Sequence, residues 1–205
     1  MSIIYTFDNK VLKNSANDKW FKKATDPCNP LGLPPYTIRV KFQSGTYPNI
    51  GSGATKTRVD ATNNIWDIYK QSSDWSNLFQ ASNNNLLEVI GANTTNVTNM
   101  KSMFTYCNRL TNVALFDTSN VTNMVGMFDS CDQLTLIPLF NTSKVTNMNY
   151  TFRNCTHVDG GALALYQQAS SQTTPPSNHN GTFNNCGSNS NTGRVELAQI
   201  PSDWK

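Results

Sequence analysis

The sequence predicts an α/β solenoid built from 24-residue coils, each with a short strand and a helix, preceded by a small β-rich N-terminal module. Two observations predict this fold. The tetrapeptide Val-Thr-Asn-Met begins at Val97 and recurs at Val121 and Val145, a constant step of 24 residues. A phenylalanine and a cysteine follow each copy at the same step. Such a period is typical of coils that bury their apolar faces only against neighbouring coils.

The first half of each coil is predicted to be a helix. Apolar residues occur there at i, i+3, i+4 and i+7, the spacing that places side chains on one helical face. Thr98 precedes the first set and is suited to cap the helix. The third copy has Thr151 where the others have a second methionine. In the first copy the four residues are Met100, Met103, Phe104 and Cys107.

The second half of each coil is predicted to contain a short strand, at 110–116 and again at 134–140. Leucine, then valine or isoleucine, then leucine recur there at the spacing of alternating strand side chains. The outward positions are the candidate ligand contacts, and an alternative is that the two phenylalanines among them pack inward at a corner of the coil. The candidates are Asn112, Ala114, Phe116, Leu136, Pro138 and Phe140.

Equivalent positions in stacked coils share one environment, so the repeated phenylalanines and cysteines are predicted to form a buried structural ladder. The cysteine spacing lacks a C-x2-C or Cys/His metal pattern, and we expect neither disulfides nor a metal, nor a cofactor. Cys28 stands apart as a loop thiol. The ladder residues are Phe104, Phe128, Phe152, Phe183, Cys107, Cys131, Cys155 and Cys186.

Worn copies of the coil are expected at both ends of the repeats. Residues 75–79 are predicted to form an N-terminal capping helix, and residues 162–169 are composed of strong helix formers. Trp204 is placed to cover the last coil. The solenoid with its caps is therefore predicted to span residues 75–205.

The first 74 residues are predicted to attach the protein to something else. Residues 1–35 form an extended arm, and residues 36–74 form a small β-rich attachment module with strands at 37–42 and 65–69. An arm with alternating aromatic residues can add as a strand to a partner subunit, or it can dock on its own domain. The candidate assembly contacts are Tyr5, Phe7, Trp20 and Phe21.

Composition excludes several classes of function. Charged residues make up 14% of the chain, against about 25% in an ordinary soluble domain, and the net charge is +3 without a basic run, so nucleic acid is not an expected partner. Paired carboxylates, a nucleophile with matching His and acid, and a phosphate loop are not apparent, so we expect no enzyme. A secretory signal and an apolar run of about 20 residues are also not apparent, which predicts synthesis in a cytoplasm without membrane insertion.

With its unit written as FDTSNVTNMxxMFxxCxxLTxIPL, the chain resembles the BspA-type leucine-rich repeats, including the short form known as a mycoplasma repeat of unknown function. The resemblance covers about residues 75–160 and returns at 181–201. It implies a surface or adhesion role, as in bacteria and protists. The whole layout also resembles short leucine-rich-repeat proteins of tailed phages that infect gut Bacteroides, through the Tyr5–Lys10 opening, the 34–39 segment and the ending that runs from 162–168 to 200–205.

The phage resemblance implies a non-enzymatic structural or decoration protein of the virion, made in the host cytoplasm and released by lysis. Its expected partners are capsid, fibre or tail subunits, and a homotrimer would suit such a display. The repeats would then bind a glycan or a protein on the host or mucosal surface. The alternative is a BspA-like adhesin on the bacterial cell surface or secreted from it.

Overall fold

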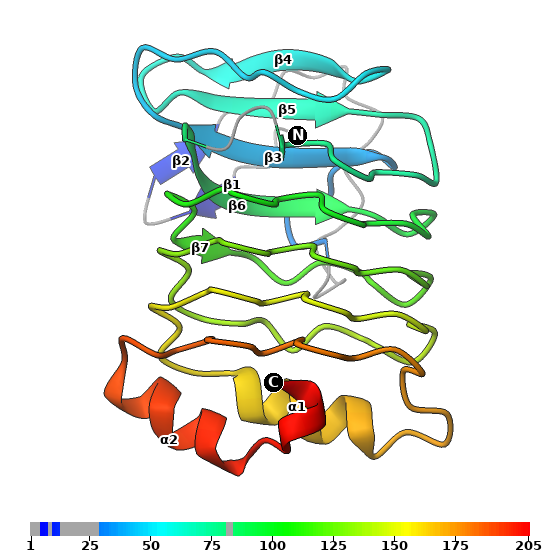
Figure 1. Ribbon diagram of the computed structural model, residues 1–205. Coiled ribbons are helices and arrows are strands. Elements are labelled where there is room, and N and C mark those ends of the chain that lie inside the picture. Colours follow the sequence, from blue (N-terminus) through cyan, green and yellow to red (C-terminus); the bar gives the residue numbers. More distant parts are fainter. Residues whose placement is uncertain (1–4, 8–9, 13–28, 81–83) are drawn as a thin grey trace.

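The computed structural model describes residues 5–7, 10–12, 29–80 and 84–205. The first two segments form a two-stranded antiparallel sheet of β1 (Tyr5–Phe7) and β2 (Lys10–Leu12). The rest is a stack, with strand β4 at one end and helices α1 and α2 at the other (Figure 1). Within the described ranges, no helix has the length and apolar character needed to cross a membrane.

Five strands form a mixed sheet in the order β4-β5-β3-β6-β7. The pairs among the first four strands are antiparallel, and β6 pairs with β7 in parallel. Because β6 pairs with β3 and β7 pairs with β6, the sheet continues across the predicted domain boundary at residue 74. The strands are β3 (Thr37–Phe42), β4 (Thr55–Asp60), β5 (Ile65–Tyr69), β6 (Leu86–Asn93) and β7 (Asn112–Val113).

The strands predicted at 37–42 and 65–69 are confirmed as β3 and β5. Strand β4 was not predicted, because nearly all its side chains are exposed and it lacks the alternation of apolar and polar residues that marks a half-buried strand. It pairs with β5 and forms the outer strand of the sheet, where neither face needs to be apolar.

The predicted α/β solenoid of strand-plus-helix coils is wrong. The molecule is mostly β, and its described part contains two short α-helices, α1 (Ala162–Ser170) and α2 (Asn191–Gln199), followed by the 3-10 helix η2 (Ser202–Trp204). Only α1 lies where a helix was predicted. The segments at 75–79, 100–107, 124–131 and 148–155 are turns, and the strand expected at 110–116 is reduced to β7.

The segments at 100–107, 124–131 and 148–155, each predicted as a helix, consist of two successive four-residue turns. In the first copy, the Met103 N–H donates to the Met100 carbonyl at 3.2 Å, and the Cys107 N–H donates to the Phe104 carbonyl at 3.0 Å. The third residue of each turn has positive φ, as in a type II turn. Because both ends of each turn point inward, the pair reproduces the i, i+3, i+4, i+7 spacing of a helix without being one.

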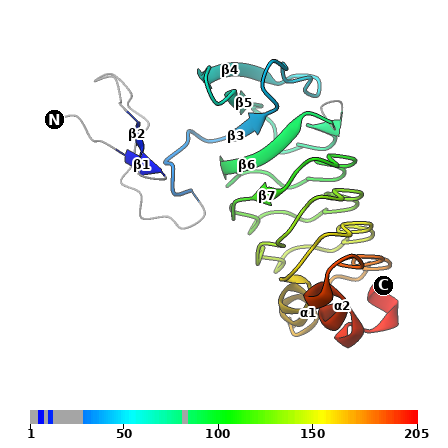
Figure 2. The ribbon, with the colours of Figure 1, turned by 90° about the vertical axis from the view of Figure 1, so that its left-hand side faces the viewer.

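We call the stacked turn segments rungs: residues 75–80, 100–107, 124–131, 148–155 and 179–186. Backbone hydrogen bonds join each rung to the next, as from the Phe104 N–H to the Met127 carbonyl at 2.9 Å. Thr98 does not cap a helix, and its hydroxyl donates to the Ser73 carbonyl of the preceding turn. Figure 2 shows the resulting stack from the side.

A column of aromatic rings runs through the centre of the rungs. Neighbouring centroids lie 5.3 Å apart for Phe79 and Phe104, and 5.1 Å apart for Phe104 and Phe128. Phe152 and Phe183 continue the stack, with centroids 6.0 Å apart. Trp204 ends it 6.3 Å from Phe183 and is itself buried, as expected of a residue that covers the last coil.

Helices α1 and α2 lie together at the C-terminal end of the stack (Figure 1). The Glu196 carboxylate of α2 accepts hydrogen bonds from the N–H groups of Gly161 and Leu163, and so satisfies the free amides at the start of α1. At the start of α2, a Cβ on Gly193 would lie 2.3 Å from the Val158 carbonyl oxygen, so this close packing requires glycine.

Candidate functional site

The predicted ligand-contact residues separate into two groups. Asn112 and Leu136 are exposed and Ala114 is half-buried, so these three can be reached from solvent. Pro138 is buried, and the Phe116 and Phe140 rings are buried with centroids 5.0 Å apart. As ligand contacts, Phe116, Pro138 and Phe140 are therefore wrong; the phenylalanines pack inward, which is the alternative that the sequence left open.

The sequence pattern missed two outward leucines. Leu115 and Leu139 are 37% and 53% exposed, although strand alternation would turn them inward. Strand β7 stops at Val113 and regular alternation ends with it, so Leu115 is exposed and Phe116 is buried. Leu136 is 57% exposed, and we call these three outward side chains the leucine face.

The predicted assembly contacts lie mostly outside the described residues. Tyr5 and Phe7 belong to β1, whose backbone alone is described, while Trp20, Phe21 and the loop cysteine Cys28 are outside the described ranges. The described part of the arm begins at Asn29. Its Leu31 side chain lies against Gly91, and the Leu33 carbonyl accepts a hydrogen bond from the Asn93 side chain.

The ladder cysteines lie buried in one column, and all four thiols are free. Burial raises the pKa of Cys131 and Cys155 well above the ordinary range, and raises that of Cys186 to about 12. The Cys131 thiol donates to the Phe104 carbonyl at 3.1 Å. In the described part of the chain, no group of three or more His, Cys, Asp or Glu residues is arranged to hold a metal ion.

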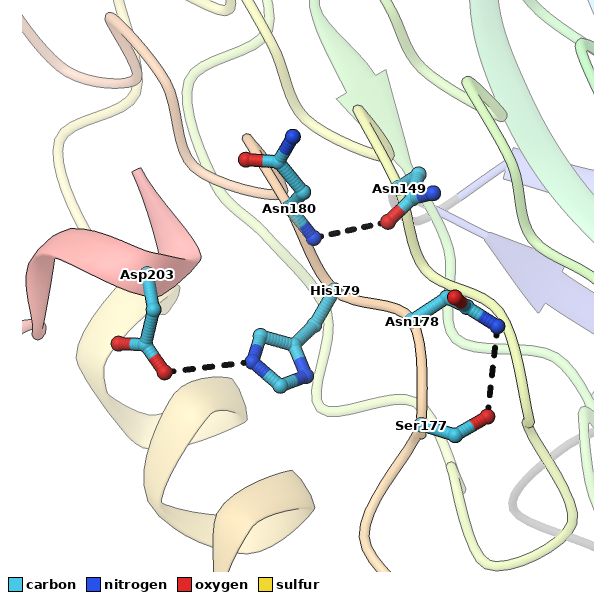
Figure 3. A pocket seen from close by; sticks show the side chains of 6 residues that line it. All are labelled: Asn149, Ser177, Asn178, His179, Asn180 and Asp203. Carbon is cyan, nitrogen blue, oxygen red and sulfur yellow. Dashed lines mark hydrogen bonds and ion pairs between the residues drawn. The ribbon is translucent and has the colours of Figure 1, made fainter.

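A polar depression of about 490 Å³ opens at the C-terminal end of the stack (Figure 3). Its residues come from the fourth rung, from the fifth rung with the segment that leads into it, and from η2. It is shallow and open to solvent, so a ligand would be held from one side. Its lining residues are Asn149, Ser177, Asn178, His179, Asn180 and Asp203.

Hydrogen bonds hold the lining of this depression in place. The side-chain oxygen Oδ1 of Asn149 accepts from the Asn180 backbone N–H at 2.8 Å, which joins the fourth and fifth rungs. His179 Nε2 lies 3.3 Å from a carboxylate oxygen of Asp203, and its Nδ1 lies 2.9 Å from the Pro176 carbonyl. The imidazole also stacks on Trp204, with centroids 4.2 Å apart. The side chains are therefore positioned before any ligand arrives.

A second cluster of polar and aromatic side chains is formed by residues of the second, third and fourth rungs. Arg153 forms a two-pronged ion pair with the nearly buried Asp129, with Nε 3.0 Å from Oδ1, and hydrogen bonding to Asp129 raises the pKa of Arg153. The guanidinium lies over the Tyr150 ring, 4.6 Å from its centroid. Tyr106 is 49% exposed. The two charged groups of the cluster, Arg153 and Asp129, are therefore paired with each other.

A family model described as "Mycoplasma protein of unknown function, DUF285" matches residues 63–194. The chain belongs to this family. The DUF285 match covers all five rungs and every lining residue of the depression except Asp203, and it supports the resemblance to the mycoplasma-type repeat. Comparison with curated proteins finds no match, and comparison with solved structures finds none.

Proposed function

We propose that this protein is a non-enzymatic binding protein, a structural or decoration component of a phage particle. Its N-terminal part attaches to capsid, fibre or tail subunits, and its rungs face outward for adhesion to a glycan or protein on the host or mucosal surface. The observation that carries the proposal is the array of outward side chains, repeated along the stack on a backbone whose hydrogen bonds run from rung to rung.

A rigid array favours binding because less conformational entropy is lost when a ligand is held. The asparagines that directly precede the rungs illustrate this rigidity. The side-chain oxygens of Asn123 and Asn147 each accept a hydrogen bond from the N–H two residues onward, at 3.1 Å in both rungs. The same asparagines form a parallel bridge across the stack. Surface side chains are thus ordered by the fold itself.

The state of the reactive groups supports a binding role over a catalytic one. The ladder thiols are buried, with pKa values raised by that burial, so they are poor nucleophiles at neutral pH. Asp129 is paired with Arg153. In the depression, the two ring nitrogens of His179 are both engaged, Nε2 with the Asp203 carboxylate and Nδ1 with the Pro176 carbonyl.

Labelling of intact particles tests the proposed location. Antibody against this protein should bind purified particles, and deletion of residues 1–28 should abolish incorporation while the remaining chain still folds. Residues 29–33 should be kept, because Leu33 is buried and Leu31 lies on Gly91. Normal incorporation of the truncated protein would contradict the proposed division of labour.

The second candidate is a BspA-like adhesin on a bacterial surface. It is favoured by the family to which the chain belongs, since that family is described from Mycoplasma, a bacterium. Neighbouring genes distinguish the two candidates: capsid and tail genes on both sides support the particle component, and their absence together with labelling of uninfected cells supports the adhesin.

A further inference from the structure

We propose that the depression in Figure 3 binds an uncharged sugar residue, such as a terminal pyranose of a surface glycan. This inference rests on the proposed adhesion function and gives it a place and a ligand class. A sugar hydroxyl donates one hydrogen bond and accepts others, so a sugar site needs donors and acceptors close together on one surface.

The depression supplies both kinds of group. Asn180 is exposed and forms its hydrogen bonds through its backbone, so the donors and the acceptor of its side-chain amide are available. The Asn149 oxygen is occupied, which leaves its amide nitrogen to donate. Asp203 uses one oxygen toward His179, and its side chain is 65% exposed, so the second oxygen can accept.

The depression also offers an apolar surface for the C–H side of a pyranose. Trp204 covers one face of the His179 ring at an interplanar angle of 12°, and the ring lines the depression. The imidazole has a polar neighbour at each nitrogen, the Pro176 carbonyl and the Asp203 carboxylate, and these neighbours restrain the ring. A flat, fixed ring among amides and a carboxylate is suited to a sugar ring, which is apolar on its faces and polar at its rim.

Charge selects against acidic sugars. The Asp203 carboxylate borders the depression and repels a sialic acid carboxylate, a sulfate or a phosphate, whereas it accepts hydrogen bonds from neutral hydroxyls. Asparagine amides supply the remaining contacts without adding charge. One shallow site gives weak binding, and many copies on one particle strengthen adhesion by about 10²–10⁴-fold.

The test uses the full chain, displayed in many copies on streptavidin, on an array of neutral, sialylated, sulfated and phosphorylated glycans. We expect binding to neutral glycans. Asn180→Ala should lower that signal at least tenfold, by removing one set of hydrogen bonds to the sugar. Asn184→Ala is the matched control, because Asn184 is exposed on the same rung, outside the depression, with hydrogen bonds from its backbone only. The Asn184→Ala variant should bind neutral glycans as strongly as the unchanged protein does.

Asp203→Asn supplies a second variant that keeps the side-chain shape. It should lower binding to neutral glycans and should reduce the discrimination against sialylated ones. Equal thermal midpoints of the variants and the parent protein establish that each is folded.

Three outcomes overturn the inference: binding only to acidic glycans, unchanged binding by Asn180→Ala, or an equal loss in Asn184→Ala. Adhesion of the protein to host cells separates the inference from the proposed function. If cells are bound but no glycan is, the sugar site is wrong and the adhesion function stands. If neither is bound, both fail.

Discussion

The segment at 100–107 and helix α1 bury apolar residues at the same spacing, yet they fold differently. Met100, Met103 and Cys107 are buried in the rung at i, i+3 and i+7. In α1 the buried residues at these steps are Ala162, Leu165 and Ala169. The first segment is a pair of turns and the second is an α-helix. Apolar spacing therefore identifies the inward residues without identifying the backbone conformation.

The difference lies in where the backbone N–H groups find acceptors. A rung has a neighbour that supplies carbonyls, as Asn123 does for the Met100 N–H and Val125 does for the Ser102 N–H. Helix α1 lies at the end of the stack, where a further rung does not follow (Figure 2). Its N–H groups must bond within the segment, and its composition of alanine, leucine and glutamine favours that helix. Buried backbone groups need partners, and the position in the stack decides which partners are available.

Removal of one ring from the aromatic column should have the largest effect. Phe128 is fully buried between Phe104 and Phe152, whose centroids lie 5.1 and 5.2 Å away. Phe128→Ala should lower the free energy of unfolding by about 3–5 kcal/mol. Denaturant titration measures it. Leu165→Ala in α1 should cost less, because that helix packs against the stack from one side; a larger loss in α1 would contradict the central role of the column.

Loss of a buried hydroxyl between two rungs should have an intermediate effect. The Thr151 hydroxyl lies 2.9 Å from the Met124 carbonyl oxygen and 2.6 Å from that of Met148, and its single hydrogen is donated to one of them or shared between them. Thr151→Val should reduce stability by about 1–2 kcal/mol, because at least one of these buried carbonyls loses its side-chain partner. Thr122→Val removes a similar bond at an exposed position, to the Thr98 carbonyl, and should change the denaturation midpoint little.

Glycine substitutions should have opposite signs in the two segments. Ser102 has a φ of 53°, which glycine adopts without steric cost, and Gly126 occupies the equivalent position in the next rung. Ser102→Gly should stabilise the protein by about 1 kcal/mol. Ala164→Gly, at an exposed position inside α1, should destabilise it by about 1 kcal/mol. Thermal midpoints measure both, and the same sign in both variants would refute the assignment of turns to the rungs.

Thiol labelling should measure whether the cysteines of the rungs stay buried, with no substitution in the rungs themselves. Burial raises the pKa of Cys107, Cys131, Cys155 and Cys186, so these thiols stay protonated and inaccessible at pH 8 in the folded protein. A Cys28→Ser variant should therefore show no rapid reaction with a thiol reagent until denaturant unfolds it. Rapid labelling of any of the four under native conditions would show that the column opens locally.

The candidate site was predictable in part. The exposed positions of Asn112 and Leu136 follow from the repeat, whereas the leucine face depends on the end of regular alternation after β7, which no local pattern marks. The depression could not be predicted, because Asn149, His179 and Asp203 are far apart in the sequence and meet only when η2 folds back on the fifth rung. A sequence signal does exist for its aromatic support, since Trp204 was expected to cover the last coil.

By itself, the sequence determined the 24-residue period, the inward residues of each repeat, strands β3 and β5, and helix α1. These follow from local composition and from the burial of apolar side chains, which act over a few residues. Tertiary structure alone decided that the repeats are turns, that the sheet extends from β4 to β7, and which side chains meet in the depression. The physical reason is that backbone groups in a rung are satisfied by residues about 24 positions away, so their conformation is chosen only when the neighbouring rung is in place.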